Sequence, residues 1–437
     1  MNISVIGCGY LGAVHAACMA HLGHDVVGID TDRRKVDALS DGQAPFFEPG
    51  FPELLREAVE SGRLRFTDDF SEAADSDAHF LCVGTPQRDE DGAADLRHVD
   101  AAFEALLPHL DEHDLVIGKS TVPVGTAERM AGRLETSGTG ARLAWNPEFL
   151  REGFAVDDTL RPDRLVYGVP DGEPGRQATA TLDSVYATAL EAGTPQIVTD
   201  YGTAQLVKVA ANSFLATKIS FINAMSEVCE ATGSDVTALA EALGHDDRIG
   251  NKFLRAGLGF GGGCLPKDIR AFQVRAGEVG ADQALSFLSD VDAINTRSRE
   301  RTVEHARQLC GGSFDGARIA VLGAAFKPNS DDVRDSPALD VALRLQRAGA
   351  AVVVTDPQAN ANAVKAWPEL DVVDEVESAA TGADLVVLVT EWQQFRDLDP
   401  AKLGTAVRER RILDARNVLD PAAWREAGWT YRGLGRR

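Results

Sequence analysis

The chain has 437 residues and a formal net charge of −23, with 67 acidic side chains against 44 Lys and Arg. This balance argues against nucleic acid as a partner, because phosphate backbones are bound by clustered basic residues. Only nine of the basic residues are lysines. An acidic, lysine-poor surface is typical of proteins from halophilic organisms, in which salt screens the repulsion between carboxylates.

The length allows two or three domains, each with its own core. No apolar run reaches the roughly 18 residues that a membrane-spanning helix needs, so we expect a soluble protein with no membrane partner. The six cysteines contain no CxxC pair. Neither a disulfide framework nor a cysteine zinc site is indicated, and a reducing cytoplasm is the expected setting.

The first 30 residues predict a dinucleotide-binding unit. An apolar strand leads into Gly7-x-Gly9-x-x-Gly12, a helix follows, and a second strand at 25–30 ends in Asp30. The glycines allow a tight turn and close approach of a pyrophosphate, and the helix N-terminus binds it. Asp30 would accept a hydrogen bond from a ribose hydroxyl and repel a 2′-phosphate, so the pattern favours NAD over NADP.

Further apolar runs at 79–83, 115–118 and 143–145 end in polar residues. The carboxyl ends of strands in an open parallel sheet face one crevice, where ligands bind. Thr85, Thr121 and Glu148 are therefore expected to line the cofactor cleft. Each of them alone would also fit an ordinary turn or cap.

The segment 146–152 predicts the start of a helix, with an Asn cap, Pro147 at the first helical position and two glutamates on one face. Paired carboxylates at Glu148 and Glu152 would position a water or a substrate. They would equally complement the helix dipole, which is the commoner role of early glutamates.

A long helix is predicted from Tyr201 to about Thr232, ended by Gly233. Its length suits a domain link or a dimer interface. Lys208 and Asn212 share one face of it, among apolar neighbours. A helical lysine is usually solvated, but a desolvated lysine beside an amide would form an oxyanion site.

The run from Gly259 to Asp268 sets a single cysteine between a glycine turn and a probable helix start. Pro266 suits the first helical turn, which puts Cys264 at the helix N-terminus, where the dipole favours the thiolate. Asp268 follows one turn later and would serve as a base or bind a water. The alternative is a glycine turn that holds an inert cysteine.

The last part of the chain has the same strand pattern as the first part but lacks the GxGxxG motif. A strand at 317–323 and another at 352–356 flank a loop that carries Lys327 and Arg334, which suit the phosphates of a second nucleotide. The alternative is a solvated charged loop. We predict no metal site, since His109 and His113 lie among acidic residues in an exposed connection.

The motifs as a set resemble the UDP-glucose/GDP-mannose dehydrogenase family. The resemblance rests on Gly7 to Gly12, Asp30, Lys35, Glu48-Pro49-Gly50, Gly84-Thr85-Pro86, 120–123, 146–153, Lys208 to Asn212, 260–268, 326–334 and 414–417. It implies an α/β fold of two Rossmann-like, doubly wound domains joined by a central helical dimerisation region. We expect an NAD-binding domain at 1–195, the dimerisation region at 196–300, and a nucleotide-sugar domain at 301–437.

The resemblance also implies a two-step oxidation of the C6 alcohol of a nucleotide sugar to a carboxylate, with Cys264 as the nucleophile. Lys208, Asn212 and Asp268 would assist the first step, and Thr121 would orient the hydrolytic water. Whether Glu148 or Asp268 is the base stays open. NAD contacts are expected at Gly7, Gly9, Leu11, Gly12, Asp30, Lys35, Thr85, Thr121, Glu152, Lys267 and Arg334. Substrate contacts are expected at Glu148, Phe149, Leu150, Arg151, Glu152, Lys208, Asn212, Phe253, Leu254, Arg255, Ala256, Gly257, Gly261 and Lys327, and at Arg416 from across a dimer interface.

The expected substrate is UDP-glucose, with UDP-glucuronate as the product and GDP-mannose as the runner-up, and the expected assembly is a homodimer or larger homo-oligomer. The chain departs from the family pattern at Leu11, where many members have valine, and at Gly263, where many have serine. Two other classes stay open. A single-step hydroxyacid dehydrogenase would need no nucleophilic cysteine, and a silent nucleotide-sugar sensor would need no intact catalytic set.

Overall fold

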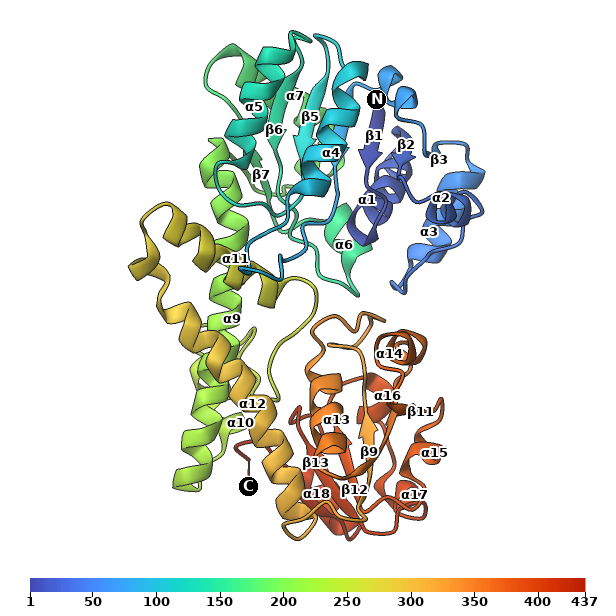
Figure 1. The fold of residues 1–437 in the computed structure, drawn as a ribbon, viewed down its shortest axis with the longest axis vertical. Coiled ribbons are helices and arrows are strands. Elements are labelled where there is room, and N and C mark those ends of the chain that lie inside the picture. Colours follow the sequence, from blue (N-terminus) through green and yellow to red (C-terminus); the bar gives the residue numbers. More distant parts are fainter. Residues whose placement is uncertain (437) are drawn as a thin grey trace. The chain divides into compact units, whose positions relative to one another are not determined.

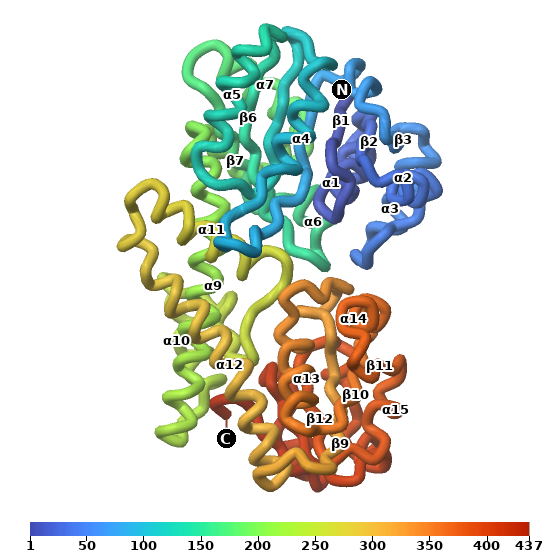
Figure 2. The backbone as a smooth tube through the Cα atoms, in the orientation of Figure 1, coloured from blue at the N-terminus to red at the C-terminus, as the bar shows by residue number. Residues whose placement is uncertain are grey.

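The computed structural model describes residues 1–436, and its path is traced in Figures 1 and 2. The chain forms two compact units. Unit 1 contains Met1–Ala211 and Arg270–Gly280, and unit 2 contains Asn212–Ile269 and the residues from Ala281 onward. Helix α9 (Tyr201–Thr232) and helix α11 (Leu265–Glu278) each begin in one unit and end in the other.

Unit 1 is built on an eight-stranded sheet in the order β3-β2-β1-β4-β5-β6-β7-β8. The first six strands are parallel, and β7 runs antiparallel to β6. Placing β1 between β2 and β4 gives the strand order of a dinucleotide-binding fold. The strands are β1 Asn2–Ile6, β2 Asp25–Ile29, β3 Leu64–Thr67, β4 Ala78–Leu81, β5 Leu115–Gly118, β6 Arg142–Trp145, β7 Leu165–Gly168 and β8 Gln196–Thr199.

Helices cover both faces of this sheet, and the strands are accordingly apolar on both sides. Leu115 and Ile117 of β5 belong to one buried cluster, while Val116 between them belongs to the other. The helices of unit 1 are α1 Tyr10–His21, α2 Arg33–Ser40, α3 Phe51–Glu60, α4 Arg97–Leu106, α5 Thr126–Ser137, α6 Ala155–Leu160, α7 Glu173–Val185 and α8 Ala187–Glu191, with 3₁₀ turns at Phe70–Asp75 and Leu107–His109.

Unit 2 repeats the same topology in a six-stranded parallel sheet, in the order β11-β10-β9-β12-β13-β14. Its strands are β9 Arg318–Leu322, β10 Ala351–Thr355, β11 Asp371–Val372, β12 Leu385–Leu388, β13 Arg411–Asp414 and β14 Thr430–Gly433. Besides part of α9, its helices are α10 Val236–Gly244, α12 Phe287–Leu309, α13 Pro337–Arg347, α14 Asn360–Ala366, α15 Val376–Ala380, α16 Gln393–Arg396, α17 Pro400–Leu403 and α18 Pro421–Glu426, with a 3₁₀ turn at Asp282–Leu285.

The expected fold class is confirmed: two parallel, Rossmann-like sheets are joined along the chain by a long helical region that includes α9 and α12. The expected helix at 201–232 is α9, and the helix expected after Cys264 is α11. Within residues 1–436, no helix is long and apolar enough to cross a membrane.

The helix start expected at Pro147 is wrong. Residues 146–150 form no regular element, and the next helix, α6, begins only at Ala155. Gly153 has a φ of +80°, which ends any regular run there. The side chain of Asn146 does not cap a helix; its amide instead donates to the backbone oxygen of Val166 at 2.9 Å.

Candidate active site

The turn between β1 and α1 has the shape that a dinucleotide pyrophosphate requires. Gly7 has a φ of +88°, and a Cβ on Gly12 would lie 1.9 Å from the backbone oxygen of Gly7. A Cβ on Gly9 would meet nothing within 4 Å, so the space beside it is open. Gly9 precedes α1 without any side-chain cap, which leaves the N-terminal amides of the helix for an anion.

Asp30 follows β2 and is 8% exposed. One of its oxygens accepts from the backbone N–H of Cys8 at 2.8 Å and from Lys35 Nζ at 2.7 Å. The Asp30–Lys35 ion pair lies at the place where a ribose hydroxyl binds in this fold. The following expected cofactor residues therefore lie in unit 1: Leu11 and Gly12 on α1, Lys35 on α2, and Gly7, Gly9 and Asp30 in the turns that follow β1 and β2.

Thr85 and Thr121 come together at the carboxyl ends of adjacent strands, as expected. Thr85 follows β4 and Thr121 follows β5, and the hydroxyl of Thr85 donates to the backbone oxygen of Thr121 at 2.8 Å. This bond ties the two strand ends together at the edge where ligands of such sheets bind.

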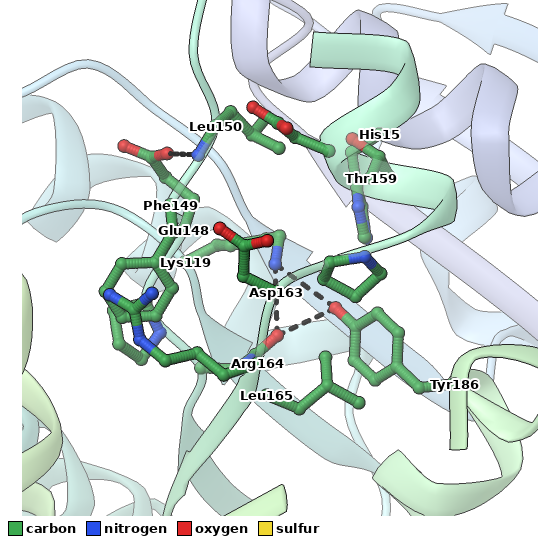
Figure 3. A pocket seen from close by; sticks show the side chains of 14 residues that line it. His15, Lys119, Glu148, Phe149, Leu150, Thr159, Asp163, Arg164, Leu165 and Tyr186 are labelled. Carbon is green, nitrogen blue, oxygen red and sulfur yellow. Dashed lines mark hydrogen bonds between the residues drawn. The ribbon is translucent and has the colours of Figure 1, made fainter. Parts of the chain in front are cut away.

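A buried cation anchors the segment that follows β6. Lys119 Nζ donates to Asn146 Oδ1 at 3.0 Å and to the hydroxyl of Tyr186 at 3.1 Å. It also lies within 6 Å of the ring centroids of Phe80 and Tyr186. Burial lowers the pKa of Lys119 to about 8. Figure 3 shows Lys119 and Tyr186 pointing toward one another, among the residues that line a cavity of about 50 Å³.

Glu148 and Lys208 form a desolvated ion pair in unit 1. Lys208 Nζ lies 2.9 Å from Glu148 Oε1, and the two side chains are only 6% and 12% exposed. The ammonium also lies over the ring of Phe149 at 5.7 Å. The solvated surface role of a helical lysine is therefore excluded for Lys208, and a charge in a dry site acts strongly on a nearby oxygen.

Glu48 holds the rest of this segment in place. Its carboxylate, 1% exposed, accepts from the backbone N–H of Gly153 at 2.6 Å and of Ala155 at 2.7 Å. It also forms a very short bond with the hydroxyl of Tyr10. Burial first, and then this bond to Glu48, raise the pKa of Tyr10 far above its usual value. Phe149, Leu150, Arg151 and Glu152 lie in the segment so anchored.

In unit 2, Cys264 occupies the N-cap position of α11. Its backbone oxygen accepts from the N–H of Asp268 at 2.9 Å, and the helix begins at the next residue. Cys264 is exposed, while four of the other five cysteines are buried and Cys310 is half-buried. The thiol therefore meets the positive end of a helix dipole in an accessible place, as a nucleophilic thiolate requires.

Asp268 binds one expected catalytic group, Asn212, and one expected NAD contact, Lys267. It is 3% exposed and accepts from Asn212 Nδ2 at 2.6 Å and from Lys267 Nζ at 2.5 Å. Lys208 precedes Asn212 by one turn in α9. The contact between Asn212 and Asp268 brings together two residues that the family resemblance assigns to the first oxidation.

One expected substrate residue, Phe253, is among the strained residues of unit 2. All four non-glycine residues of positive φ within residues 1–436 lie there: Phe253, Asn329, Asp335 and Asn417. Such conformations cost about 1 kcal/mol or more each and gather at ligand sites. Phe253 begins the expected segment Phe253–Gly257 and is itself 41% exposed.

The side chain of Arg416, in unit 2, is 12% exposed, and its guanidinium is turned toward the loops. It donates to the backbone oxygens of Gly259 at 3.0 Å, Val389 at 2.7 Å and Phe326 at 3.3 Å. Lys327 lies over the ring of Phe326, and Arg334 pairs with Asp332.

Sequence reasoning missed the roles of Lys119 and Glu48. Glu48 stands inside a motif that the family resemblance rests on, and Lys119 directly precedes another, but nothing local tells which distant group each one binds. Glu48 bonds to amides more than 100 positions away.

Family profiles match the chain in three consecutive parts. The profile described as the NAD binding domain of the UDP-glucose/GDP-mannose dehydrogenase family matches residues 1–190. The central domain of that family matches 202–297, and its UDP binding domain matches 320–421.

Individual relatives align over the full length. The UDP-glucose 6-dehydrogenase of Rhizobium meliloti is 42% identical over 439 residues, which cover all of both chains. A solved UDP-glucose dehydrogenase from Pyrobaculum islandicum is 38% identical, with a TM-score of 0.90 over 100% of this chain and 98% of that one. A GDP-mannose dehydrogenase from Pseudomonas aeruginosa is 27% identical, with a TM-score of 0.54 over 99% and 100% of the two chains.

Proposed function

The chain belongs to the UDP-glucose/GDP-mannose dehydrogenase family, and we propose that it oxidises UDP-glucose to UDP-glucuronate. The reaction converts a C6 alcohol, two NAD and one water into a carboxylate, two NADH and three protons. The observation that carries the proposal is the exposed Cys264 at the N-cap of α11, one turn from Asp268. A nucleophile is what a second oxidation at the same carbon requires.

Unit 1 fits NAD at the turn after β1. The open space beside Gly9, the uncapped start of α1 and the carboxylate of Asp30 suit the pyrophosphate and the ribose. When bound, NAD supplies the hydride acceptor. The residues assigned to it are those named above, together with Thr85, Thr121, Glu152, Lys267 and Arg334.

In the first oxidation, the C6 hydroxyl loses its proton and C6 loses a hydride, which leaves an aldehyde. Asp268, directly or through a water, takes the proton. Lys208 and Asn212 stabilise the negative charge that grows on the oxygen. The low exposure of Lys208 and Asn212, 5% and 8%, supports these roles, because their charge and dipole act with little screening.

In the second oxidation, the Cys264 thiolate adds to the aldehyde carbon, and the carbonyl oxygen takes a proton to give a thiohemiacetal. Loss of that proton and of the remaining hydride yields a thioester. Water, oriented by Thr121, then attacks the thioester carbon, the C–S bond breaks and the thiolate leaves. The base for this water is Glu148 or Asp268, and Glu148 lies 2.9 Å from the catalytic Lys208 Nζ.

UDP-glucose is preferred to GDP-mannose because the enzymes named for UDP-glucose are closer to this chain. The R. meliloti enzyme is 42% identical, whereas the GDP-mannose dehydrogenase is 27% identical and has a TM-score of 0.54. Substrate contacts are proposed at Glu148–Glu152, Lys208, Asn212, Phe253–Gly257, Gly261, Lys327 and Arg416.

We further propose that the chain self-associates through α9. Phe214, Phe221 and Val228 of this helix are spaced seven residues apart and are 67%, 49% and 52% exposed. A stripe of large apolar side chains at heptad spacing is typical of a helix that packs on a partner. Light scattering should give twice the monomer mass or a multiple of it, and a monomer at micromolar concentration would refute this part.

The proposed function is tested by the number of NADH molecules formed per molecule of nucleotide sugar when the sugar is limiting. Two NADH per UDP-glucose, with UDP-glucuronate as the product, are expected. One NADH per substrate molecule would indicate a single-step dehydrogenase, turnover of GDP-mannose without UDP-glucose would change the substrate, and no NADH with either sugar would leave a binding protein.

A further inference from the structure

The glycine turn that precedes Cys264 is packed closely from two sides. Gly259 has a φ of +105°, and a Cβ on it would lie 2.3 Å from Asn295 Oδ1. A Cβ on Gly261 would lie 2.1 Å from the backbone oxygen of Asp335. Gly259 and Gly261 therefore fit their neighbours only as glycine, with α12 against the first and the 326–335 segment against the second.

Asn295 pairs with the turn as a neighbouring strand would. Its Oδ1 accepts from the backbone N–H of Phe260 at 2.8 Å, and its Nδ2 donates to the backbone oxygen of the same residue at 3.0 Å. Asn295 is 1% exposed. A side-chain amide that satisfies both backbone groups of one residue fixes the orientation of that peptide, because no water competes for them.

Arg299, one turn further along α12, binds the same residue of the turn, Phe260. Its Nη2 donates to the backbone oxygen of Phe260 at 3.0 Å, and its Nη1 lies 3.2 Å from Asp335 and 3.4 Å from Asp340. Asp335 is one of the strained residues, with a φ of +43°. One guanidinium therefore ties the turn before Cys264 to the segment that packs on it.

We propose that Asn295 and Arg299 are positioning residues that hold the Gly259–Gly263 turn and so set where the sulfur of Cys264 lies. The side chain of Cys264 is exposed, and the backbone of the turn decides the direction of its Cα–Cβ bond. The functional meaning of this inference rests on the proposed role of Cys264 as the nucleophile. A displacement of about 1 Å at such a group reduces a rate on the order of a hundredfold.

The experiment uses the full-length protein with Asn295→Asp, Asn295→Ser and Arg299→Lys. Asn295→Asp keeps the acceptor for the Phe260 N–H but places a carboxylate oxygen against the Phe260 backbone oxygen, where the amide donated. The side chain in Asn295→Ser is too short for either bond. Arg299→Lys keeps the positive charge but loses the two guanidinium nitrogens that bind Phe260 and Asp335 at the same time. The control is Ser298→Ala, since Ser298 is 2% exposed on the same helix and its hydroxyl bonds to Ile294 within that helix.

The first measurement is alkylation of Cys264 by iodoacetamide at pH 7, followed by peptide mass spectrometry, with circular dichroism to report the folded fraction. We expect the Asn295 variants to react at least about fivefold more slowly, because the sulfur leaves the helix N-terminus that favours its thiolate. Ser298→Ala should react at the wild-type rate. Wild-type alkylation in folded Asn295 and Arg299 variants would overturn the proposal.

The second measurement is single-turnover NADH release with UDP-glucose. Slower release of the second NADH than of the first, with NAD affinity within about twofold of wild type, is the positioning signature. Equal slowing of both, or weak NAD binding, would indicate a merely structural role and also refute the proposal. If Asn295→Ser does not fold, the milder Arg299→Lys decides. If the variants show altered alkylation but the wild-type protein makes no NADH, the positioning role is supported and the proposed function is refuted.

Discussion

Replacement of Glu48 should test how the segment 146–155 is held. Three donors point at its buried carboxylate: the N–H groups of Gly153 and Ala155 and the hydroxyl of Tyr10. Glu48→Ala leaves all three buried without this acceptor, at about 1–3 kcal/mol each before relaxation. We therefore expect the free energy of unfolding to fall by about 3–5 kcal/mol. Glu48→Gln keeps one oxygen and should cost about 1–3 kcal/mol.

The assay is urea unfolding of both variants beside Glu53→Gln, an exposed glutamate of α3 that should change stability by less than about 0.5 kcal/mol. Because the anchored segment carries Glu148 and Glu152, we also expect a higher KM for UDP-glucose in Glu48→Gln. A Glu48→Ala variant as stable as wild type, with unchanged KM, would show that Glu48 does not hold this segment.

Three further predictions concern pH, glycine and salt. Burial would raise the pKa of Glu230, but the bond from His305 and the nearby positive charges lower it to about 2. The stabilisation from a lowered carboxyl pKa is present above about pH 4 and is lost as pH falls toward 2. Because Glu230 is exposed and solvent screens its charge, Glu230→Gln should cost about 0.5–1 kcal/mol at pH 6 and less at pH 3; an equal loss at both would contradict this. Gly261→Ala should greatly reduce stability and activity, because its Cβ meets backbone. Gly263→Ala should be tolerated, because its Cβ meets only the movable guanidinium of Arg334. Equal melting temperatures of the two variants would contradict this expectation. From the net charge of −23, thermal stability should rise in molar salt, and a maximum in dilute buffer would argue against it.

Local signals predicted much of the fold and of the site. The fingerprint around Gly9, the apolar period of α9 and the proline after Cys264 each depend on neighbours within one or two turns, and all three elements form as expected. In such places the residues that determine the backbone are adjacent in the chain.

The failures come from long-range contacts. The cap and proline at 146–147 predict a helix start, yet Gly153 is left-handed and Glu48, 105 positions before it, binds the amides of Gly153 and Ala155. The role of Asn295 has no local sequence signal, because Asn295 lies inside helix α12 and its partner, Phe260, is 35 positions earlier in the chain. Tertiary hydrogen bonds decide both cases, and a single sequence does not record them.

The most direct test of the account is the rate of UDP-glucuronate formation by Cys264→Ser, measured by chromatography at saturating NAD and UDP-glucose. A serine hydroxyl is far less ionised than a thiol at a helix N-terminus, and an ester hydrolyses without the thiolate leaving group. We predict a fall of at least about a hundredfold in the rate of acid formation, with NAD affinity preserved. An unchanged rate of acid formation would contradict the central role of Cys264.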